Sequence, residues 1–555
     1  MLPQNCFIFT KEDAASLQQS YLFGYGLTDD ALIFGTDGLR AFQAAGNTEF
    51  PTEGRFAGLF LTSDQEIVIR TDATGQELLY LFRNDDDWAV SSSFMLLTEW
   101  ARTRQRLNTY APAIVGFHLK NGVHVGEQLI SHRTMVEEIS VVPLTTELIV
   151  NRATGKMRQK TRSFIDAFSF APDDKWDEKV IDVLERGAGI MGAIQSTGAP
   201  LNLFLSGGYD SRLVLAMAMA NGATPENLRV TSHLSKEDDF RVASELCETL
   251  GLPLNTPGPS TVSQLSDSDA IRMYMLSSGA TYLPFYPVYS HFTEDSAQVR
   301  LTGDQPTGWT FFDGKARFNG DANKVGADIE EALIARSFGG AVKDDFLSVF
   351  RDLEIEHDHP AAMLANYCAI RSRHHCGRNW YRSTGPVFLF TPLMQSAFVS
   401  LDLMNANEGH HTKKLFADIF SAFGGWAIET PFETPARNLD RELIENSVFK
   451  GGVRITPKPF RVFGKIKRNS AQEAGFLSVD FRFRAKPDRM KTYLADMVYQ
   501  ADAARQSGLF SNQDITDAKA ELQSDVQLSH GTRRSCHLIA TNRVLEMIGS
   551  SGPAN

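Results

Sequence analysis

The sequence predicts an α/β protein of two domains, on three observations. The chain has 555 residues, which is more than one hydrophobic core usually supports. Residues 1–162 alternate short apolar runs with turn residues, a pattern typical of β-strands. Residues 163–555 begin with alternating strands and helices, which predicts a doubly wound parallel sheet, and continue into a mainly helical C-terminal part.

The strand-rich part ends at a clear change of composition. A polar, turn-forming and basic stretch at residues 151–156 follows the last strand-like run and precedes a region of helical periodicity. We therefore place the domain boundary just beyond it, after residue 162. The strands expected before this boundary include the apolar runs 59–61, 67–69 and 78–82.

The second domain opens with a helix, a strand and another helix. Apolar residues recur at helical spacing between positions 180 and 194, which predicts one buried helix face. The apolar run 201–205 predicts a strand covered on both faces, as in parallel sheets. Residues 212–221 read as a helix that Gly222 closes in the left-handed conformation.

The same order then repeats. Residues 228–231 predict a second strand, and the helix after it ends at Gly251. Ligands of doubly wound sheets bind beyond the carboxyl ends of the strands, which is where the loop 206–211 lies. Beyond about residue 330 the sequence is mainly helical.

Composition and charge exclude several classes of protein. The formal net charge of -12 argues against a general nucleic-acid or anionic-membrane binder. No apolar run reaches the ~20 residues of a membrane helix, and no positive charge opens a secretory signal. The five cysteines lack CxxC spacing, which argues against a disulfide framework or a zinc ribbon. We expect a cytoplasmic protein that acts on a small molecule or a peptide.

The loop 206–211, with the sequence SGGYDS, carries the chemistry. Gly207 and Gly208 remove the side chains that would keep backbone N–H groups away from a phosphate. Ser206 and Ser211 add hydroxyl donors, and the N-terminus of the next helix favours an anion. Asp210 would repel a polyphosphate unless a cation lay between them, which makes it a candidate magnesium ligand. The plainer alternative is a glycine turn with a capping side chain, but the order of strand, loop and helix favours phosphate binding.

Residues 201–216 resemble the strand and SGGxDS loop of asparagine synthetases and their relatives. The resemblance implies a PP-loop ATP pyrophosphatase domain that uses ATP and Mg²⁺. It further implies that a substrate carboxylate is adenylated with release of pyrophosphate and that an amine then forms an amide. The partners implied are a small molecule or peptide bearing the carboxylate and the amine; a homodimer stays open.

The same resemblance implies a set of site residues around the ends of neighbouring strands. Asp210 and Asp304 are the implied metal ligands. No residue is assigned a catalytic role. The implied ATP-binding residues are Leu205, Ser206, Gly207, Gly208, Asp210, Ser211, Thr231 and Gly303.

The N-terminal part resembles the glutamine amidotransferase domain of the same family, through residues 54–58, 72–75 and 90–93. This implies an αββα Ntn-hydrolase-like fold. Working members use a cysteine at the processed N-terminus as nucleophile, whereas here residue 2 is Leu2 and Cys6 lies further along. We therefore expect a degenerate domain without glutamine hydrolysis, as in β-lactam synthetases and lasso-peptide cyclases.

The synthetase part departs from the family at two places. The Asp-Glu pair of relatives aligns with Thr307 and Gly308, and no lysine stands in residues 429–438, where relatives have one. Arg212 follows the loop, where it either contacts phosphate or, as we expect, pairs with an acid. Lysines that offer a substitute elsewhere are Lys413, Lys414 and Lys450.

Two further features have plainer interpretations. The basic stretch 450–468 suggests RNA or pyrophosphate binding, but the acidic chain favours a solvated loop or a cover over the ATP site. The adjacent pairs His374-His375 and His410-His411 point their rings apart, which is poor geometry for one metal.

Two other functions compete with an amide ligase. The missing Asp-Glu pair and lysine are compatible with a catalytically impaired pseudo-synthetase that binds nucleotide or a partner. A PP-loop enzyme of sulfur transfer or tRNA modification is the third alternative. The absence of CxxC pairs and the acidic charge count against that third alternative.

Overall fold

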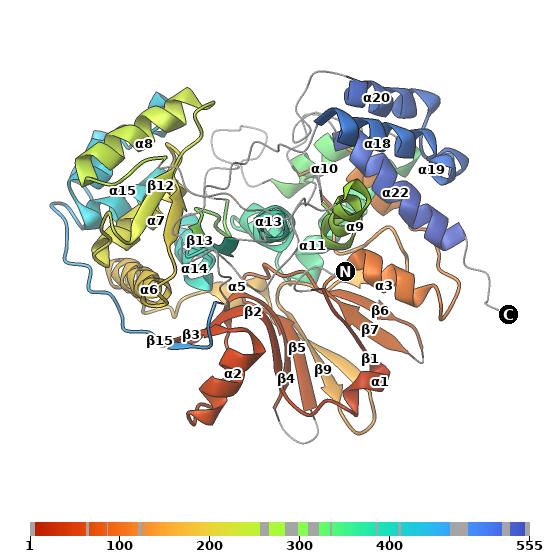
Figure 1. The fold of residues 1–555 in the computed structure, drawn as a ribbon, viewed down its shortest axis with the longest axis horizontal. Coiled ribbons are helices and arrows are strands. Elements are labelled where there is room, and N and C mark those ends of the chain that lie inside the picture. Colours follow the sequence, from red (N-terminus) through yellow and green to blue (C-terminus); the bar gives the residue numbers. More distant parts are fainter. Residues whose placement is uncertain are drawn as a thin grey trace.

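The protein is a mixed α/β structure with three sheets and many helices (Figure 1). In this view of the computed structural model the first two sheets lie below, the third sheet lies to the left and the last helices lie to the right. The residues described are 6–62, 66–85, 87–119, 125–126, 128–255, 266–282, 298–308, 321–333, 336–383, 387–408, 412–466, 487–523 and 533–549.

Two sheets form the N-terminal part. One has four antiparallel strands in the order β1-β7-β6-β8, and the other has seven strands in the order β10-β9-β5-β4-β2-β3-β15. The predicted strands 59–61 and 67–69 lie in β4 and β5, and the run 78–82 overlaps β6. The strands are β1 (Ile8–Thr10), β2 (Tyr21–Leu27), β3 (Ala31–Phe34), β4 (Glu53–Leu61), β5 (Glu66–Thr71), β6 (Tyr80–Arg83), β7 (Trp88–Ser91), β8 (Ile139–Val141), β9 (Thr146–Asn151), β10 (Met157–Thr161) and β15 (Arg461–Phe463).

These two sheets pack face to face through an apolar core that includes Leu59, Ile69, Leu81 and Val90. Helix α2 (Gly35–Ala44) covers the outer face of the seven-stranded sheet, where Phe42 is buried. Helix α3 (Phe94–Ala101) packs on the outer face of the four-stranded sheet. The N-terminal part therefore has four layers, in the order helix, sheet, sheet, helix.

The third sheet is parallel and has the order β12-β11-β13-β14. Its strands are β11 (Leu201–Phe204), β12 (Leu228–Thr231), β13 (Gln298–Leu301) and β14 (Val387–Phe390). Residues 201–203 are all buried although they point to alternating faces, which confirms that β11 is covered on both sides. The strand β14 belongs to the part of the sequence that the periodicity predicts to be mainly helical.

The helices around this sheet follow the predicted order. Helix α6 (Trp176–Ser196) buries the apolar face predicted between residues 180 and 194. Helix α7 (Tyr209–Ala220) starts three residues earlier than predicted, so the last three residues of SGGYDS lie in its first turn. Gly222 has a φ of 79° and Gly251, which ends α8 (Glu237–Leu250), has a φ of 65°, so both take the left-handed conformation predicted for them.

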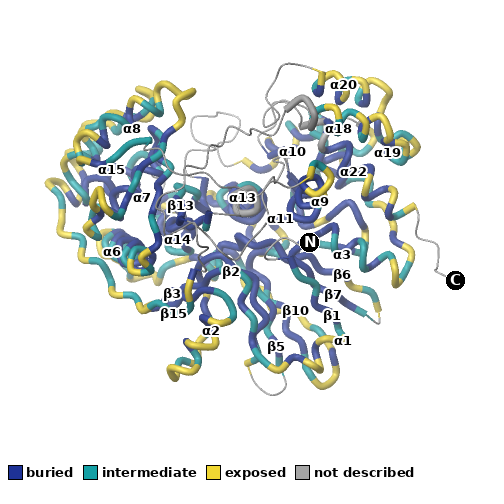
Figure 2. The backbone as a smooth tube through the Cα atoms, viewed as in Figure 1, coloured by how far each residue is buried: buried dark blue, intermediate teal, exposed yellow. Residues whose placement is uncertain are grey.

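The remaining helices surround these sheets, and Figure 2 shows the buried interior running from the parallel sheet into the N-terminal sheets. None of the described helices is long and apolar enough to cross a membrane. They are α1 (Lys11–Ala14), α4 (Ala111–Phe117), α5 (Phe164–Phe168), α9 (Asp267–Ser278), α10 (Ala322–Glu331), η2 (Arg336–Phe338), α11 (Gly339–Asp352), α12 (Ala362–Asn366), the π-helical turn η3 (Tyr367–Ser372), α13 (Arg373–Ser383), α14 (Ser396–Asn407), α15 (Thr412–Phe423), α16 (Trp426–Glu429), η4 (Pro435–Arg437), α17 (Arg441–Glu445), α18 (Pro487–Tyr499), α19 (Asp502–Gln506), α20 (Asn512–Gln523) and α22 (Arg533–Gly549).

The basic stretch that begins at residue 450 returns to the N-terminal part. The backbone N–H of Lys458 donates to the carbonyl of Glu185 on α6, and β15 then pairs in parallel with β3. The side chain of Arg461 forms an ion pair with Asp30 at 2.9 Å. The interpretation of this stretch as a cover over the ATP site is therefore wrong for residues 456–463. Lys467 and Arg468 lie outside the described residues, and the division of the chain at residue 162 stays a prediction.

Helix α13 lies against the N-terminal sheets and is held there by buried arginines. The guanidinium of Arg373 donates to the carbonyls of Gly75 and Val142, both at 3.0 Å. Conversely, Arg55 of β4 donates to the carbonyl of Gly377 on α13. A Cβ atom on Gly377 would overlap the carbonyl oxygen of Gln76, so the two backbones approach closely there.

This close approach gives a test of the contact. We expect Gly377→Ala to lower the free energy of unfolding by about 1–3 kcal/mol, because backbone atoms must separate to admit the methyl group. Gly340→Ala is the matched control: this glycine is also helical, but a Cβ added to it would have no atom within 4 Å. It should leave stability unchanged or raise it by up to about 1 kcal/mol. Thermal unfolding measures both, and equal melting temperatures for the two variants would contradict a tight contact at Gly377.

Candidate nucleotide site

The SGGYDS loop lies where the strand order of the parallel sheet reverses. The chain passes from β11 through α7 to β12 on one side, while β13 and β14 lie on the other side of β11. Loops that follow β11 and β13 therefore meet at one edge of the sheet, which is the usual ligand position in open α/β sheets. These two loops are residues 205–208 and 302–308.

Hydrogen bonds inside the loop fix its shape. The Ser211 hydroxyl lies 3.0 Å from the backbone nitrogen of Ser206, which donates to it, and 3.1 Å from the Ser206 hydroxyl oxygen. The backbone N–H of Gly207 donates to Asp239 at 2.8 Å. Among the described residues no side chain caps the N-terminus of α7 at Gly208, so this end of the helix keeps its attraction for an anion.

The glycines of the site are needed for close contacts between protein segments. A Cβ atom on Gly207 would lie 2.5 Å from the Cβ of Glu433, and one on Gly303 would lie 2.6 Å from the nitrogen of Ser211. Both distances are too short for real atoms, so only glycine permits this packing. The sequence pattern explained Gly207 only by the need to let a phosphate come close to the backbone. It did not predict the contact with Glu433.

The segment 427–438 is clamped onto the loop by Arg212. This side chain has 0% relative exposure and donates to the carbonyls of Thr430 at 2.6 Å and Pro431 at 2.9 Å. It also donates to the carbonyl of Ala427 at 3.3 Å and lies 3.7 Å from the centre of the Phe432 ring. The expectation that Arg212 pairs with an acid, or alternatively with phosphate, is therefore wrong, because its donors are directed to backbone carbonyls.

Two side chains of the clamped segment reach the loop. The Glu433 carboxylate and the Arg437 guanidinium form an ion pair at 2.7 Å, and a Cβ on Gly208 would lie 3.1 Å from Nη1 of Arg437. The Tyr209 hydroxyl donates to the carbonyl of Arg437, and the backbone N–H of Glu433 donates to the carbonyl of Gly207. Neither side chain was predicted from the sequence. Their spacing of four residues, in the segment where a lysine was expected, indicates an ion pair between them.

The carboxylates of the site affect one another. Burial raises the pKa of Asp210 to about 7; Arg437 opposes this shift, while the negative charges of Asp304 and Glu433 add to it. A carboxyl group in this state gains most from a nearby cation. Asp210 and Asp304 therefore interact electrostatically, and their assignment as metal ligands stays a prediction.

The other predicted ATP-binding residues shape the edge of the sheet. Leu205 is buried and its nitrogen donates to the carbonyl of Thr231 at 2.9 Å. The Thr231 hydroxyl donates to Asn202 at 2.9 Å, and the Thr302 hydroxyl donates to Asp304 at 3.0 Å. The residues therefore lie at the ends of β11, β12 and β13, with the hydroxyl of Thr231 directed to the protein.

The turn 305–308 presents neutral groups. The Gln305 side-chain oxygen accepts from the nitrogen of Thr307 at 2.6 Å and from that of Gly308 at 2.7 Å. Gly308 has a φ of 65°, and a Cβ there would overlap the Tyr367 ring of η3. Thr307 and Gly308 therefore form a packed turn and supply no carboxylate.

The lysines considered as substitutes are engaged elsewhere or exposed. Lys413 pairs with Asp440 at 3.6 Å, and Lys414 pairs with Asp418 at 2.9 Å. Lys450 is exposed. The cation that contacts the loop is Arg437, which the sequence pattern did not single out.

The histidine pairs and Cys6 are the remaining features considered from the sequence. His374 is buried and its Nδ1 lies 2.8 Å from the carbonyl of Ile370, and His375 contacts the hydroxyl of Tyr282. The pair His410-His411 lies outside the described residues. Burial raises the pKa of the Cys6 thiol to about 12, so almost none of it is thiolate at neutral pH.

Comparisons with known proteins add little to this geometry. No known family profile matches the sequence, and no curated protein matches it. A similar solved structure is the glutamine phosphoribosylpyrophosphate amidotransferase from B. subtilis complexed with ADP and GMP, at 13% identity and a TM-score of 0.11. The match covers 50% of this chain and 46% of that chain, so it spans about half of each. A likeness at this TM-score carries no argument about function.

The Arg212 clamp gives a direct prediction. Arg212→Met keeps much of the side-chain volume but leaves buried carbonyl groups without donors. Each such carbonyl lowers the free energy of unfolding by roughly 1–3 kcal/mol. We expect a lower melting temperature and faster proteolysis within residues 427–438. Arg212→Lys should lie between wild type and Arg212→Met, because one ammonium cannot reproduce the planar fork. Wild-type melting and proteolysis of Arg212→Met would show that the clamp does not hold the segment.

Proposed function

We propose that this chain is an ATP-dependent ligase of the asparagine-synthetase type that forms an amide bond. In this proposal the four-layered N-terminal part is a degenerate Ntn-hydrolase-like amidotransferase domain, and the parallel sheet is a PP-loop ATP pyrophosphatase domain. The observation that carries the proposal is the meeting of the SGGYDS loop with Asp304 and Arg437 at the reversal of strand order. An anion-binding loop, carboxylates and a cation there suit a metal-bound polyphosphate.

The donor set fits Mg²⁺. Asp210 and Asp304 offer hard carboxylate oxygens that interact electrostatically, and such groups are the ligands Mg²⁺ prefers. Among the described residues no group of three or more His, Cys, Asp or Glu side chains forms a metal cage. This agrees with a site in which one or two carboxylates hold the ion and phosphate oxygens complete its shell. When bound, the ion would neutralise charge that develops on the phosphates.

The protein's own groups would position the nucleotide. In this proposal the N-terminus of α7 and the hydroxyls of Ser206 and Ser211, which bond each other at 3.1 Å, would serve as donors to the phosphates. Arg437 is 44% exposed and adds a positive charge at Gly208. In this proposal Arg437 takes the place of the lysine that relatives carry, and it stabilises negative charge in the transition state.

The proposed reaction has two steps. A carboxylate oxygen of the substrate attacks the α-phosphorus of ATP, the bond between that phosphorus and the bridging oxygen breaks, and pyrophosphate leaves. An amine nitrogen then attacks the activated carbonyl carbon, loses a proton, and displaces AMP to leave an amide. The buried, protonated Cys6 supports an amine that comes with the substrate over ammonia from glutamine.

The proposal predicts defined effects on nucleotide binding and turnover. We expect Mg²⁺-dependent ATP binding by calorimetry and exchange of labelled pyrophosphate into ATP when a panel of carboxylic acids is supplied. Asp210→Ala should weaken Mg·ATP binding at least tenfold, because the ion loses a ligand. Arg437→Met should lower the exchange rate at least tenfold with a smaller effect on ATP affinity, because its charge acts mainly in the transition state.

Lys450→Met is the matched control, since it removes an exposed positive charge of the same size that the proposed site does not use. It should bind ATP and exchange pyrophosphate like the wild type. ATP binding without exchange for any acid would favour the pseudo-synthetase. Unchanged ATP binding in Asp210→Ala, or no binding by the wild type, would contradict the proposed site altogether.

A further inference from the structure

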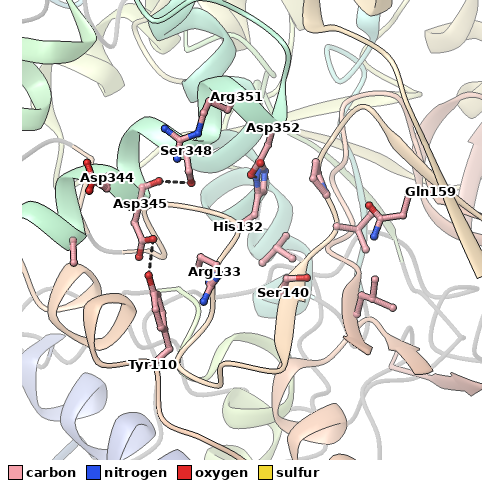
Figure 3. Close-up of a pocket in the computed structure, with 15 residues that line it drawn as sticks. Tyr110, His132, Arg133, Ser140, Gln159, Asp344, Asp345, Ser348, Arg351 and Asp352 are labelled. Atoms are coloured by element: carbon pink, nitrogen blue, oxygen red, sulfur yellow. Dashed lines mark hydrogen bonds and ion pairs between the residues drawn. The ribbon is translucent and has the colours of Figure 1, made fainter. Parts of the chain in front are cut away.

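A second site lies between the N-terminal part and α11. A cavity of about 500 Å³ is bounded on one side by Tyr110, His132 and Arg133 and on the other by Asp345 and Asp352 of α11 (Figure 3). Cavities of this volume accept small organic molecules. None of its lining residues belongs to the SGGYDS site, so it is independent of the proposed ligase chemistry.

Asp345 is a buried carboxylate with one oxygen in use. Its side chain has 7% relative exposure, and its Oδ1 accepts from the Tyr110 hydroxyl at 2.9 Å (Figure 3). Among the residues that the structure describes, its buried Oδ2 has no hydrogen-bond partner. A buried carboxylate oxygen without a donor is costly, and burial raises the pKa of this group.

His132 presents a second acceptor. Its Nδ1 lies 2.7 Å from the Asp352 carboxylate, which accepts the Nδ1 proton and leaves Nε2 as a lone-pair acceptor. Burial lowers the pKa of His132, which keeps the ring neutral. The ring has 4% relative exposure, and Nε2 has no partner within the described part of the chain.

The positive charges of the cavity lie at its rim. Arg133 and Arg351 are exposed, and the Arg133 guanidinium stacks 4.2 Å from the centre of the Tyr110 ring. The rim also carries the exposed Asp344 and the 40% exposed Asp352, so it holds both signs of charge, while the buried groups without a partner are acceptors. These buried acceptors favour a ligand whose N–H donors enter the cavity first.

We propose that this cavity binds a small organic molecule through a protonated primary amine, with Asp345 as its carboxylate partner and His132 Nε2 as a further acceptor. An ammonium group supplies N–H donors for the two unsatisfied acceptors, Asp345 Oδ2 and His132 Nε2, and a positive charge for the Asp345 carboxylate. The rim arginines are placed to accept an anionic group at the other end of the same molecule. A short ω-amino acid has both groups.

Three matched probes test this assignment by calorimetry on the full chain: butylamine, γ-aminobutyrate and butyrate. Butylamine and γ-aminobutyrate should bind, γ-aminobutyrate more tightly, and butyrate should bind at least tenfold more weakly than either. Asp345→Asn should weaken the two amines at least tenfold, because the ammonium loses its counter-charge. Glu356→Gln, which changes an exposed carboxylate that is not among the residues lining the cavity, should stay within twofold of the wild type.

The Tyr110→Phe variant tests amine binding while the Asp345 carboxylate is kept. This variant removes the phenol that engages Asp345 while keeping the ring under Arg133, so amine binding should be retained or strengthened. Equal binding of all three probes, preference for butyrate, or no binding of either amine at millimolar concentration would overturn the proposal. So would full amine affinity in a folded Asp345→Asn variant.

Discussion

The guanidinium of Arg212 donates to backbone carbonyls of a segment more than two hundred residues away, and the candidate nucleotide site takes its form from that contact. Burial of a cation is costly unless acceptors face it; Nη1 and Nη2 of Arg212 have acceptors, whereas Nε has none among the described residues. Here the acceptors belong to residues 427–431, so the segment lies across the SGGYDS loop. This brings Glu433 and Arg437 to Gly207 and Gly208.

The rest of the molecule supports this edge of the sheet. The turn 305–308 packs on the π-helical η3, and α13 continues from η3 into buried contacts with the N-terminal sheets. The seven-stranded sheet also gains β15 from beyond the clamped segment. Both ends of the candidate site are thereby tied to the N-terminal part.

The sequence predicted the local elements well where the periodicity was strong. The strand β11, the buried face of α6 and the left-handed Gly222 and Gly251 all follow from residue patterns. It did not predict β14 or β15, because short strands carry too few residues for a period to show. It also missed Arg437 and Glu433, because their spacing of four residues predicts only an ion pair with each other, and their place at the loop depends on the long-range Arg212 contact. The cavity beside Asp345 was missed for the same reason.

Hydrogen–deuterium exchange with and without Mg·ATP tests the central claim, that the SGGYDS loop and the clamped segment form one nucleotide site. We expect Mg·ATP to slow amide exchange in residues 205–211 and 427–438 together, and Arg212→Met to weaken the protection of both. Protection of the loop alone, protection confined to other parts of the chain, or no change on adding Mg·ATP would contradict this claim.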